Sequence, residues 1–110
     1  MTRTIAWLAA VAAALLAAGN PAAAQEVGDA KAGFSYADQV CAECHAVKKG
    51  ESQSPHGRAP AFELVANTRG MTAMALRVWF QSPHPSMPNL QLTEKQTDDL
   101  VAYILSLRKR

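Results

Sequence analysis

Residues 41–45 read Cys41-Ala42-Glu43-Cys44-His45, and this stretch contains both cysteines of the 110-residue chain. Two thiols three positions apart, followed at once by a histidine, form the pattern CxxCH. On one turn of chain, each thiol can add across one vinyl group of a haem, and the histidine can ligate the iron. A disulfide here would close too short a loop to stabilise the chain much, and a zinc site would lack its second pair of ligands. The pattern therefore predicts one covalently attached haem c with its iron.

The N-terminal segment has the features of a secretory signal peptide. Arg3 precedes a run of 14 apolar residues, and Ala22 and Ala24 fit the small-residue rule for cleavage after Ala24. The run is short compared with the ~20 residues that span a bilayer, so a cleaved leader is favoured over an uncleaved anchor. We expect residues 1–24 to be removed, and residues 25–110 to form one domain in the periplasm without stable membrane insertion.

Charge and length restrict what this domain can be. Its 86 residues carry 10 basic and 9 acidic side chains, and no basic cluster of the kind that binds nucleic acid is present. A domain of this size buries only a little over ~60% of its unfolded surface, so a bound cofactor is expected to contribute to its stability. The chain contains no set of general base and nucleophile and no phosphate-binding loop, so we do not expect an enzyme.

Local patterns predict helices and no sheet. Asp29 and Thr72 are placed to cap helices, and Thr93 and Gln96 match a capping box. Apolar residues follow these caps at helical spacing, and Pro60 suits the first turn of a further short helix. The polar stretch 48–58 is typical of a surface loop. The expected helices are residues 29–40, 60–67, 72–81 and 93–107.

Beyond these local patterns, residues 28–108 resemble a class I cytochrome c. The resemblance implies an all-α cytochrome c fold of about four helices around one covalently bound haem, in which the N-terminal and C-terminal helices cross. At this crossing it implies that Gly33 lets the two backbones approach, with Leu100 and Tyr103 opposite. The resemblance is carried by CxxCH and by four further stretches: 28–33, 59–62, 83–88 and 99–104.

The sixth ligand of the iron is expected to be Met87. Met87 lies between Pro85 and Pro88, in a segment that cannot be helical and that we expect to be extended and stiff. The resemblance indicates the same residue, since a methionine in a proline-rich loop before the last helix is the family's ligand. His84 is the main alternative, and the other candidates are Met71, Met74 and His56.

Two further residues are assigned to the haem site. The resemblance implies that the main-chain carbonyl of Pro60 accepts the ring N–H of His45, which would orient the ring, although Pro55 is a competing candidate. Trp79 is expected to form the haem wall together with Leu76 and Phe80, and its indole N–H could reach a haem propionate or a nearby loop. Arg58 is a second candidate for a propionate contact.

A haem with protein ligands on both faces has no vacant position for a substrate, so the expected activity is one-electron transfer. The leading interpretation is a monomeric periplasmic carrier of a respiratory chain. Its donor would be a quinol-oxidising complex or a dehydrogenase, and its acceptor a terminal oxidase or reductase. Alternatives are a dedicated haem subunit of one periplasmic dehydrogenase and a peroxidase or gas-sensing haem protein. Lys48, Lys49 and Arg58 are candidates for a docking surface.

Overall fold

The computed structural model describes residues 27–87 and 90–110. The expected signal peptide, residues 1–24, lies outside the described residues, and so does Pro88. Within these two ranges no strand is present. The elements there are four α-helices and one turn of 3-10 helix: α1 Ala30–Val40, η1 Cys41–Glu43, α2 Phe62–Ala66, α3 Ala73–Gln81 and α4 Glu94–Ser106. The prediction of an all-helical fold is confirmed. No helix within these two ranges is long and apolar enough to cross a membrane.

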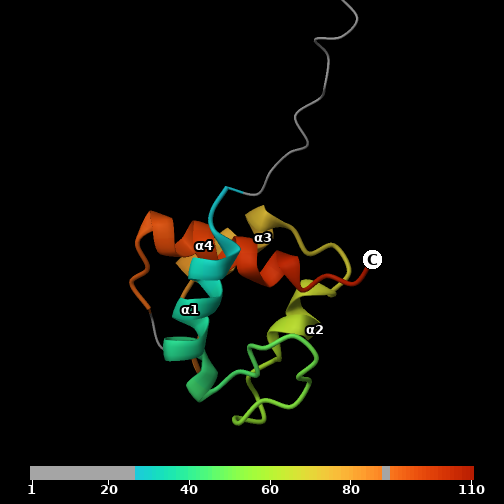
Figure 1. Ribbon diagram of the computed structural model, residues 1–110. Coiled ribbons are helices and arrows are strands. Elements are labelled where there is room, and N and C mark those ends of the chain that lie inside the picture. The colour runs from blue at the N-terminus through green and yellow to red at the C-terminus, as the bar shows by residue number, and fades with distance from the viewer. Residues whose placement is uncertain (1–26, 88–89) are drawn as a thin grey trace, which may run out of the picture.

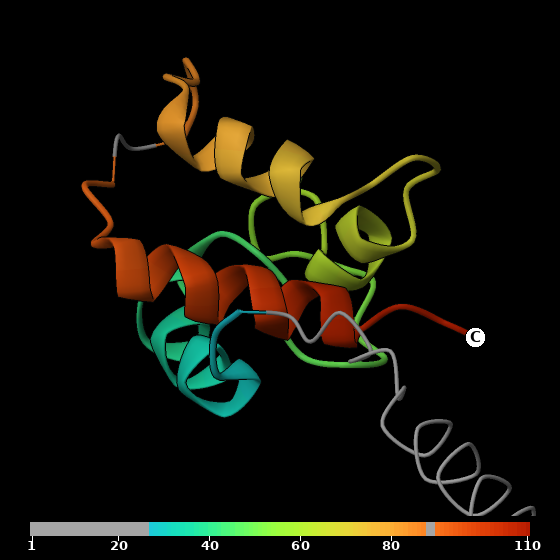
Figure 2. The same ribbon diagram turned by 90° about the horizontal axis from the view of Figure 1, so that it is seen from above.

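The C-terminal helix α4 is the centre of the fold. It contacts each of the other three α-helices. Seen from above, α1 lies on one side of α4, and α3 lies on the other (Figure 2). The loop that follows η1 runs beneath these helices and leads into α2 (Figure 1). The residues on either side of α4 are therefore positioned by their packing on one helix.

Helix α4 forms because it has a strong start signal and an apolar face. The Thr93 side chain accepts a hydrogen bond from the Gln96 N–H, and the Gln96 side chain accepts one from the Thr93 N–H, so the predicted capping box is confirmed. Leu100, Val101 and Ile104 are buried against the other helices. Full burial of each such side chain contributes about 1.5–3 kcal/mol.

Helix α1 crosses α4 at Gly33, as predicted, and the nearest atoms of α4 belong to Asp99 and Tyr103. A Cβ atom on Gly33 would lie 1.9 Å from the main-chain carbonyl oxygen of Asp99 and 2.8 Å from the Tyr103 Cβ. Leu100, which we expected opposite Gly33, directly follows Asp99 in α4, and its side chain is fully buried in the core. The Phe34 and Tyr103 rings pack beside the crossing, with centroids 5.3 Å apart.

A buried carboxylate joins the start of α1 to α4. Asp29 caps α1 by accepting the Lys31 N–H at 2.9 Å, and its own N–H donates to Asp99 Oδ1 at 2.8 Å. The Lys95 ammonium donates to Asp99 Oδ2 at 2.6 Å. The Asp29 hydrogen bond and the Lys95 hydrogen bond hold the pKa of Asp99 below its usual range. Asp99 therefore stays ionised in a largely buried position and fixes the crossing.

We predict that Gly33→Ala destabilises the protein by about 2–3 kcal/mol, because the added methyl group would overlap a main-chain carbonyl that cannot rotate away. The gain in helix propensity, about 1 kcal/mol, offsets only part of this loss. Thermal or denaturant unfolding of the holoprotein measures the change in the free energy of unfolding. Gly57→Ala is the control, since a Cβ there meets no atom within 4 Å. Equal stability of both variants would contradict a close crossing.

The predicted helices differ most from the structure at α2. The sequence places Pro60 in the first turn, whereas α2 begins at Phe62 with Ala61 as its N-cap, in an extended conformation. The prediction of the start was therefore wrong by two residues. Helix α3 begins as predicted, because the Thr72 side chain accepts the Ala75 N–H at 3.1 Å. An ion pair between Arg77 and Asp98 holds α3 on α4.

Candidate functional site

The CxxCH motif occupies one tight turn at the end of α1. The N–H groups of Cys44 and His45 both donate to the Cys41 carbonyl oxygen, at 3.1 and 2.9 Å. Cys41 is buried, Cys44 is half-buried, and no disulfide joins them. Burial raises the pKa of the Cys41 thiol to about 11, so it is protonated at neutral pH. The turn presents two thiols and one imidazole within five residues.

The His45 ring is oriented by Pro60. Its Nδ1 lies 2.6 Å from the carbonyl oxygen of Pro60, and not of the competing candidate Pro55, which is the contact that the family resemblance implied. Because a carbonyl only accepts, Nδ1 carries the proton and Nε2 is the ring nitrogen available to a metal. The ring also packs against Phe62, with centroids 5.3 Å apart. Pro60 lies outside α2, which explains why its carbonyl can turn toward His45 instead of accepting a helical hydrogen bond.

Three hydrogen bonds hold the loop after His45 in place. The Tyr103 hydroxyl, from α4, donates to the Val47 carbonyl oxygen. The Ala46 N–H donates to Ser54 Oγ at 2.9 Å, and the Ala46 carbonyl accepts the Phe62 N–H at 2.9 Å. Burial, with a smaller contribution from nearby carboxylates, raises the pKa of Tyr103, so its hydroxyl remains a donor. Together these bonds fix the position of His45 relative to Pro60.

Sequence reasoning missed Tyr103 and Ser54 as supports of this loop. Tyr103 was assigned only to the helix crossing. The signal that could have revealed it is chemical, because a tyrosine on the buried face of a helix needs a partner for its hydroxyl. Ser54 gave no comparable signal within the polar stretch.

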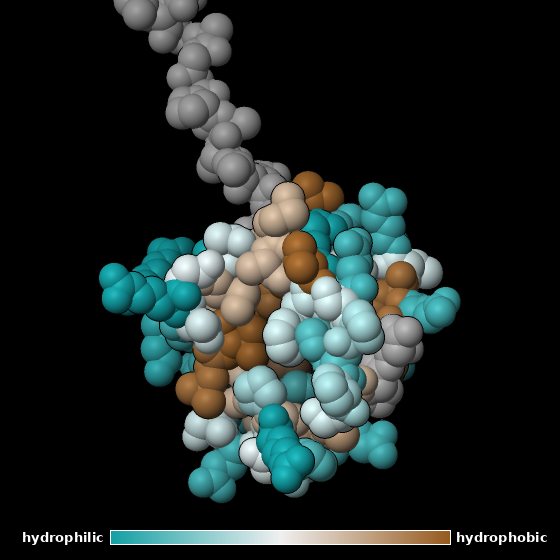
Figure 3. Space-filling view, turned by 180° about the vertical axis from the view of Figure 1, so that it is seen from behind, coloured by the Kyte–Doolittle hydropathy of each residue, from teal (hydrophilic) through white to brown (hydrophobic). Residues whose placement is uncertain are grey.

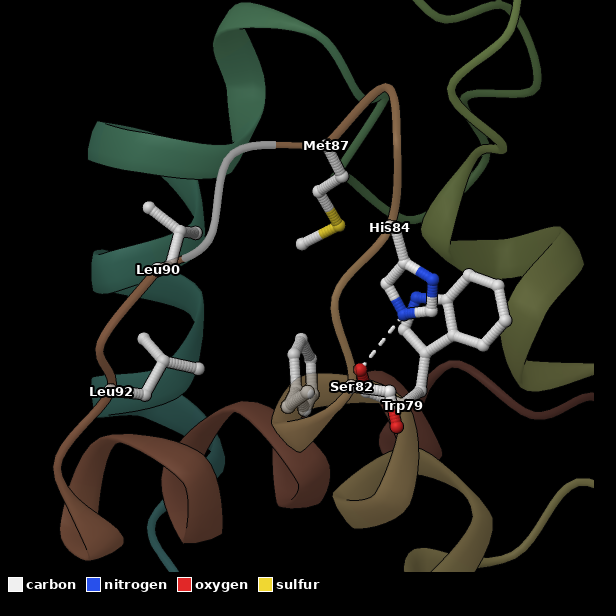
Figure 4. A pocket seen from close by; sticks show the side chains of 7 residues that line it. Trp79, Ser82, His84, Met87, Leu90 and Leu92 are labelled. Atoms are coloured by element: carbon white, nitrogen blue, oxygen red, sulfur yellow. Dashed lines mark hydrogen bonds between the residues drawn. The ribbon is translucent and has the colours of Figure 1, made fainter.

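The predicted sixth ligand lies in a different part of the molecule. Figure 4 shows the Met87 side chain directed into a pocket between the end of α3 and the chain that leads to α4. Most of the pocket's side chains are apolar or aromatic. The lining residues are Trp79, Phe80, Ser82, His84, Met87, Leu90 and Leu92.

The segment that carries Met87 is a turn and not the extended chain that we expected. The Met87 N–H donates to the His84 carbonyl oxygen at 3.3 Å, and an isolated antiparallel bridge joins the two residues. Pro85 and Ser86 form the tip of this turn. Proline fixes its own φ near −65°, which suits the first corner of such a turn as well as an extended segment. Proline content alone could not distinguish the two.

Trp79 and His84 pack on each other at the rim of the pocket. Their rings are stacked with centroids 3.7 Å apart, and His84 Nε2 lies 2.9 Å from the Trp79 carbonyl oxygen (Figure 4). Trp79 is 55% exposed, whereas Leu76 is buried in the core, so the indole ring is free to face a bound group and its expected place in the haem wall stays a prediction. Its ring lies against the His84 imidazole instead of the core.

The other candidate ligands have different surroundings. Met74 is 69% exposed on α3, and Met71 packs against the edge of the core. His56 is exposed, and its Nδ1 accepts the Arg58 N–H at 3.3 Å. Arg58 is also exposed, as expected for a loop arginine.

The candidate residues thus form two groups. Cys41, Cys44, His45 and Pro60 lie together around η1, while Trp79, His84 and Met87 lie together at the C-terminal end of α3 and the turn that follows it. Among the described residues, no hydrogen bond or ring contact links one group to the other.

The described residues fit a covalently bound haem. Two unpaired thiols and an oriented imidazole lie on one side, and an apolar pocket containing a thioether lies on another. A soft thioether and an imidazole are a donor pair that iron in electron-transfer haems accepts. Apolar side chains also remain at the surface, as the hydrophobic patch in Figure 3 illustrates. The exposed large ones on α2 and α3 are Leu64, Met74, Val78 and Trp79.

Comparison with known proteins gives a consistent result. Residues 30–108 match the family described as Cytochrome c. The chain is 32% identical over 94 residues to cytochrome c-552 of Bradyrhizobium diazoefficiens, and this alignment covers 86% of the chain and 89% of that protein. No solved structure matches the chain.

Proposed function

Because the chain belongs to the cytochrome c family, and thus binds haem c covalently and takes part in haem-based electron transfer, we propose that it is a periplasmic one-electron carrier. In this proposal, residues 1–24 are a cleaved signal peptide, and residues 25–110 form the carrier. Its donor is a quinol-oxidising complex or a dehydrogenase, and its acceptor is a terminal oxidase or reductase.

The proposed haem residues have distinct roles. Cys41 and Cys44 form the thioether bonds, and His45 and Met87 are the axial ligands. Pro60 orients His45 and raises its basicity through the 2.6 Å hydrogen bond, as partners of metal-bound histidines do. Trp79 flanks the pocket on the Met87 side. The haem supplies reversible one-electron cycling between Fe(III) and Fe(II).

The observation that carries the proposal is the direction of the Met87 side chain into the apolar pocket. A protein ligand on each face leaves no vacancy for a substrate, which favours a carrier over a peroxidase or gas sensor. The stacking of the His84 ring on the Trp79 indole places that side chain against α3, while the Met87 thioether points into the pocket, and this arrangement supports Met87 over His84 as the ligand. The neutral thioether also favours Fe(II) and so raises the potential.

The docking part of the proposal concerns Lys48 and Lys49. Both are exposed, and Lys48 lines the same surface recess as Ala42 and His45. Charges at the rim of a transient interface steer the encounter between partners more than they hold the complex. Such steering weakens as ionic strength approaches ~0.15 M, where the Debye length is about 8 Å.

We predict that electron transfer from the reduced protein to a terminal oxidase slows several-fold between low and physiological salt. Replacing Lys48 and Lys49 with glutamine should reduce both the low-salt rate and its salt dependence. The control replaces Lys109 and Arg110, which removes the same charge at the C-terminal end, away from this loop (Figure 1). Rates that do not change with salt would contradict this docking surface. A stable complex in gel filtration would favour a dedicated subunit.

A further inference from the structure

The His84 imidazole has two anchors on α3. Its Nε2 donates to the Trp79 carbonyl oxygen over 2.9 Å, and its ring stacks on the Trp79 indole with an interplanar angle of 18°. The Trp79 carbonyl lies in the last turn of α3, where helical carbonyls lack partners further along the helix. The Ser82 N–H also donates to it, at 3.2 Å, so the imidazole occupies its second acceptor position.

The anchored histidine begins the turn that ends at Met87. The His84 carbonyl accepts the Met87 N–H, and the bridge between the two residues closes the turn. Met87 is thus only three residues from a side chain that is fixed to α3. Figure 4 shows both side chains from this turn, with the imidazole against Trp79 and the thioether in the pocket.

Helix α3 is itself a firm support. Leu76 is buried in the core, and Arg77 pairs with Asp98 of α4. A movement of the turn away from the pocket would have to break the imidazole contacts, because these contacts connect its first residue to α3. The turn itself is half-buried or exposed and contains no large buried side chain. The contacts of the His84 imidazole therefore supply much of the attachment of the turn 84–87 to α3.

We propose that His84 is a positioning residue that holds the turn 84–87 on α3 and thereby keeps Met87 at the iron. This inference rests on the proposed ligation by Met87 and adds the residue that determines how firmly it binds. A ligand on an ordered turn loses less conformational entropy when it binds than a ligand on a loose one. Removing the anchor increases the fraction of molecules in which Met87 is off the iron.

The binding of added imidazole to the ferric holoprotein measures the fraction of molecules in which Met87 is off the iron. Imidazole binds only when Met87 has left the iron, so its apparent dissociation constant decreases in proportion as the Met-off population increases. We predict that His84→Ala binds imidazole about tenfold more tightly than the wild type, because it loses one hydrogen bond and one ring stack. His84→Phe keeps the stack alone, and we expect about a threefold effect.

The control is Thr68→Ala. Thr68 also donates from its side chain to a carbonyl near a helix end, that of Leu64, but it is exposed on the chain after α2. We expect its imidazole affinity to equal that of the wild type. The near-infrared band of Met-ligated Fe(III) is recorded for each variant before imidazole is added, and circular dichroism measures the helix content.

The outcomes separate this inference from the ligation on which it rests. If the band is present in all variants and His84→Ala binds imidazole no more tightly than the wild type, Met87 is the ligand but His84 does not position it. An equal increase in Thr68→Ala would also overturn the inference, because it would indicate general loosening. If the wild type lacks the band, both the ligation and the positioning role are wrong.

Discussion

Replacing both Cys41 and Cys44 with alanine should leave almost no folded holoprotein. In the proposed site two thioether bonds attach the haem, and the described core without it is small, with a pocket lined mostly by apolar side chains and with large apolar side chains left at the surface. Domains of this size are marginally stable without such a group. The yield of coloured, helical protein after export measures the effect. We expect the loss to be nearly complete.

A second measurement tests the covalent bond directly in the wild type. Acid-acetone should leave the haem colour with the polypeptide. Transfer of all the haem into acetone would exclude thioether attachment. The matched control is Glu43→Ala, because Glu43 lies on the same turn, is exposed, and leaves both thiols and the imidazole in place. It should retain its haem.

The sequence predicted the parts of the fold that depend on local signals. Helix α4 has a capping box and an apolar face, and α1 and α3 have single capping side chains. Each of these signals acts within four residues, so it can be recognised without knowledge of the tertiary structure. The CxxCH turn belongs to the same class. All three helices begin within one residue of the predicted positions.

The features that sequence reasoning missed depend on contacts between distant residues. Pro60 is excluded from α2 because its carbonyl contacts a ring 15 residues earlier. Asp99 is ionised and largely buried because it binds an N–H group 70 residues away in the chain. The Tyr103 hydroxyl reaches a carbonyl 56 residues earlier. The Asp99 and Tyr103 pairings have no periodicity or spacing that could predict them, and the contact between the Pro60 carbonyl and His45 was expected only from the family resemblance.

The turn at 84–87 shows the same limit within a short segment. The prolines correctly excluded a helix, but they allow both an extended chain and a turn. In the structure the Met87 N–H donates to the His84 carbonyl, and the His84 side chain contacts a carbonyl of α3; the prolines encode neither contact. A histidine that the sequence suggests only as an alternative ligand thus contacts α3 instead.

Met87 should control both the potential and the closure of the haem site. Met87→His should keep a six-coordinate haem but lower the potential by on the order of 0.1 V or more, within the range of about 0.8 V that axial ligands span. The imidazole is a stronger donor than the thioether and favours Fe(II) less. Met87→Ala should open a position that binds carbon monoxide and gives some peroxidase activity. Potentiometry and carbon monoxide titration measure these effects.

The near-infrared band of Met-ligated Fe(III) identifies the ligand, and it should disappear in Met87→Ala with only a modest loss of helix. Helix content should persist because the turn 84–87 contributes no residue to the buried core. Met74→Ala is the matched control, since Met74 is 69% exposed on α3 and its removal should leave the band intact. Persistence of the band in Met87→Ala would transfer the ligand role to Met71 or Met74. A wild type that never shows the band and binds carbon monoxide readily would favour a peroxidase or sensor, because only an open iron position allows that chemistry.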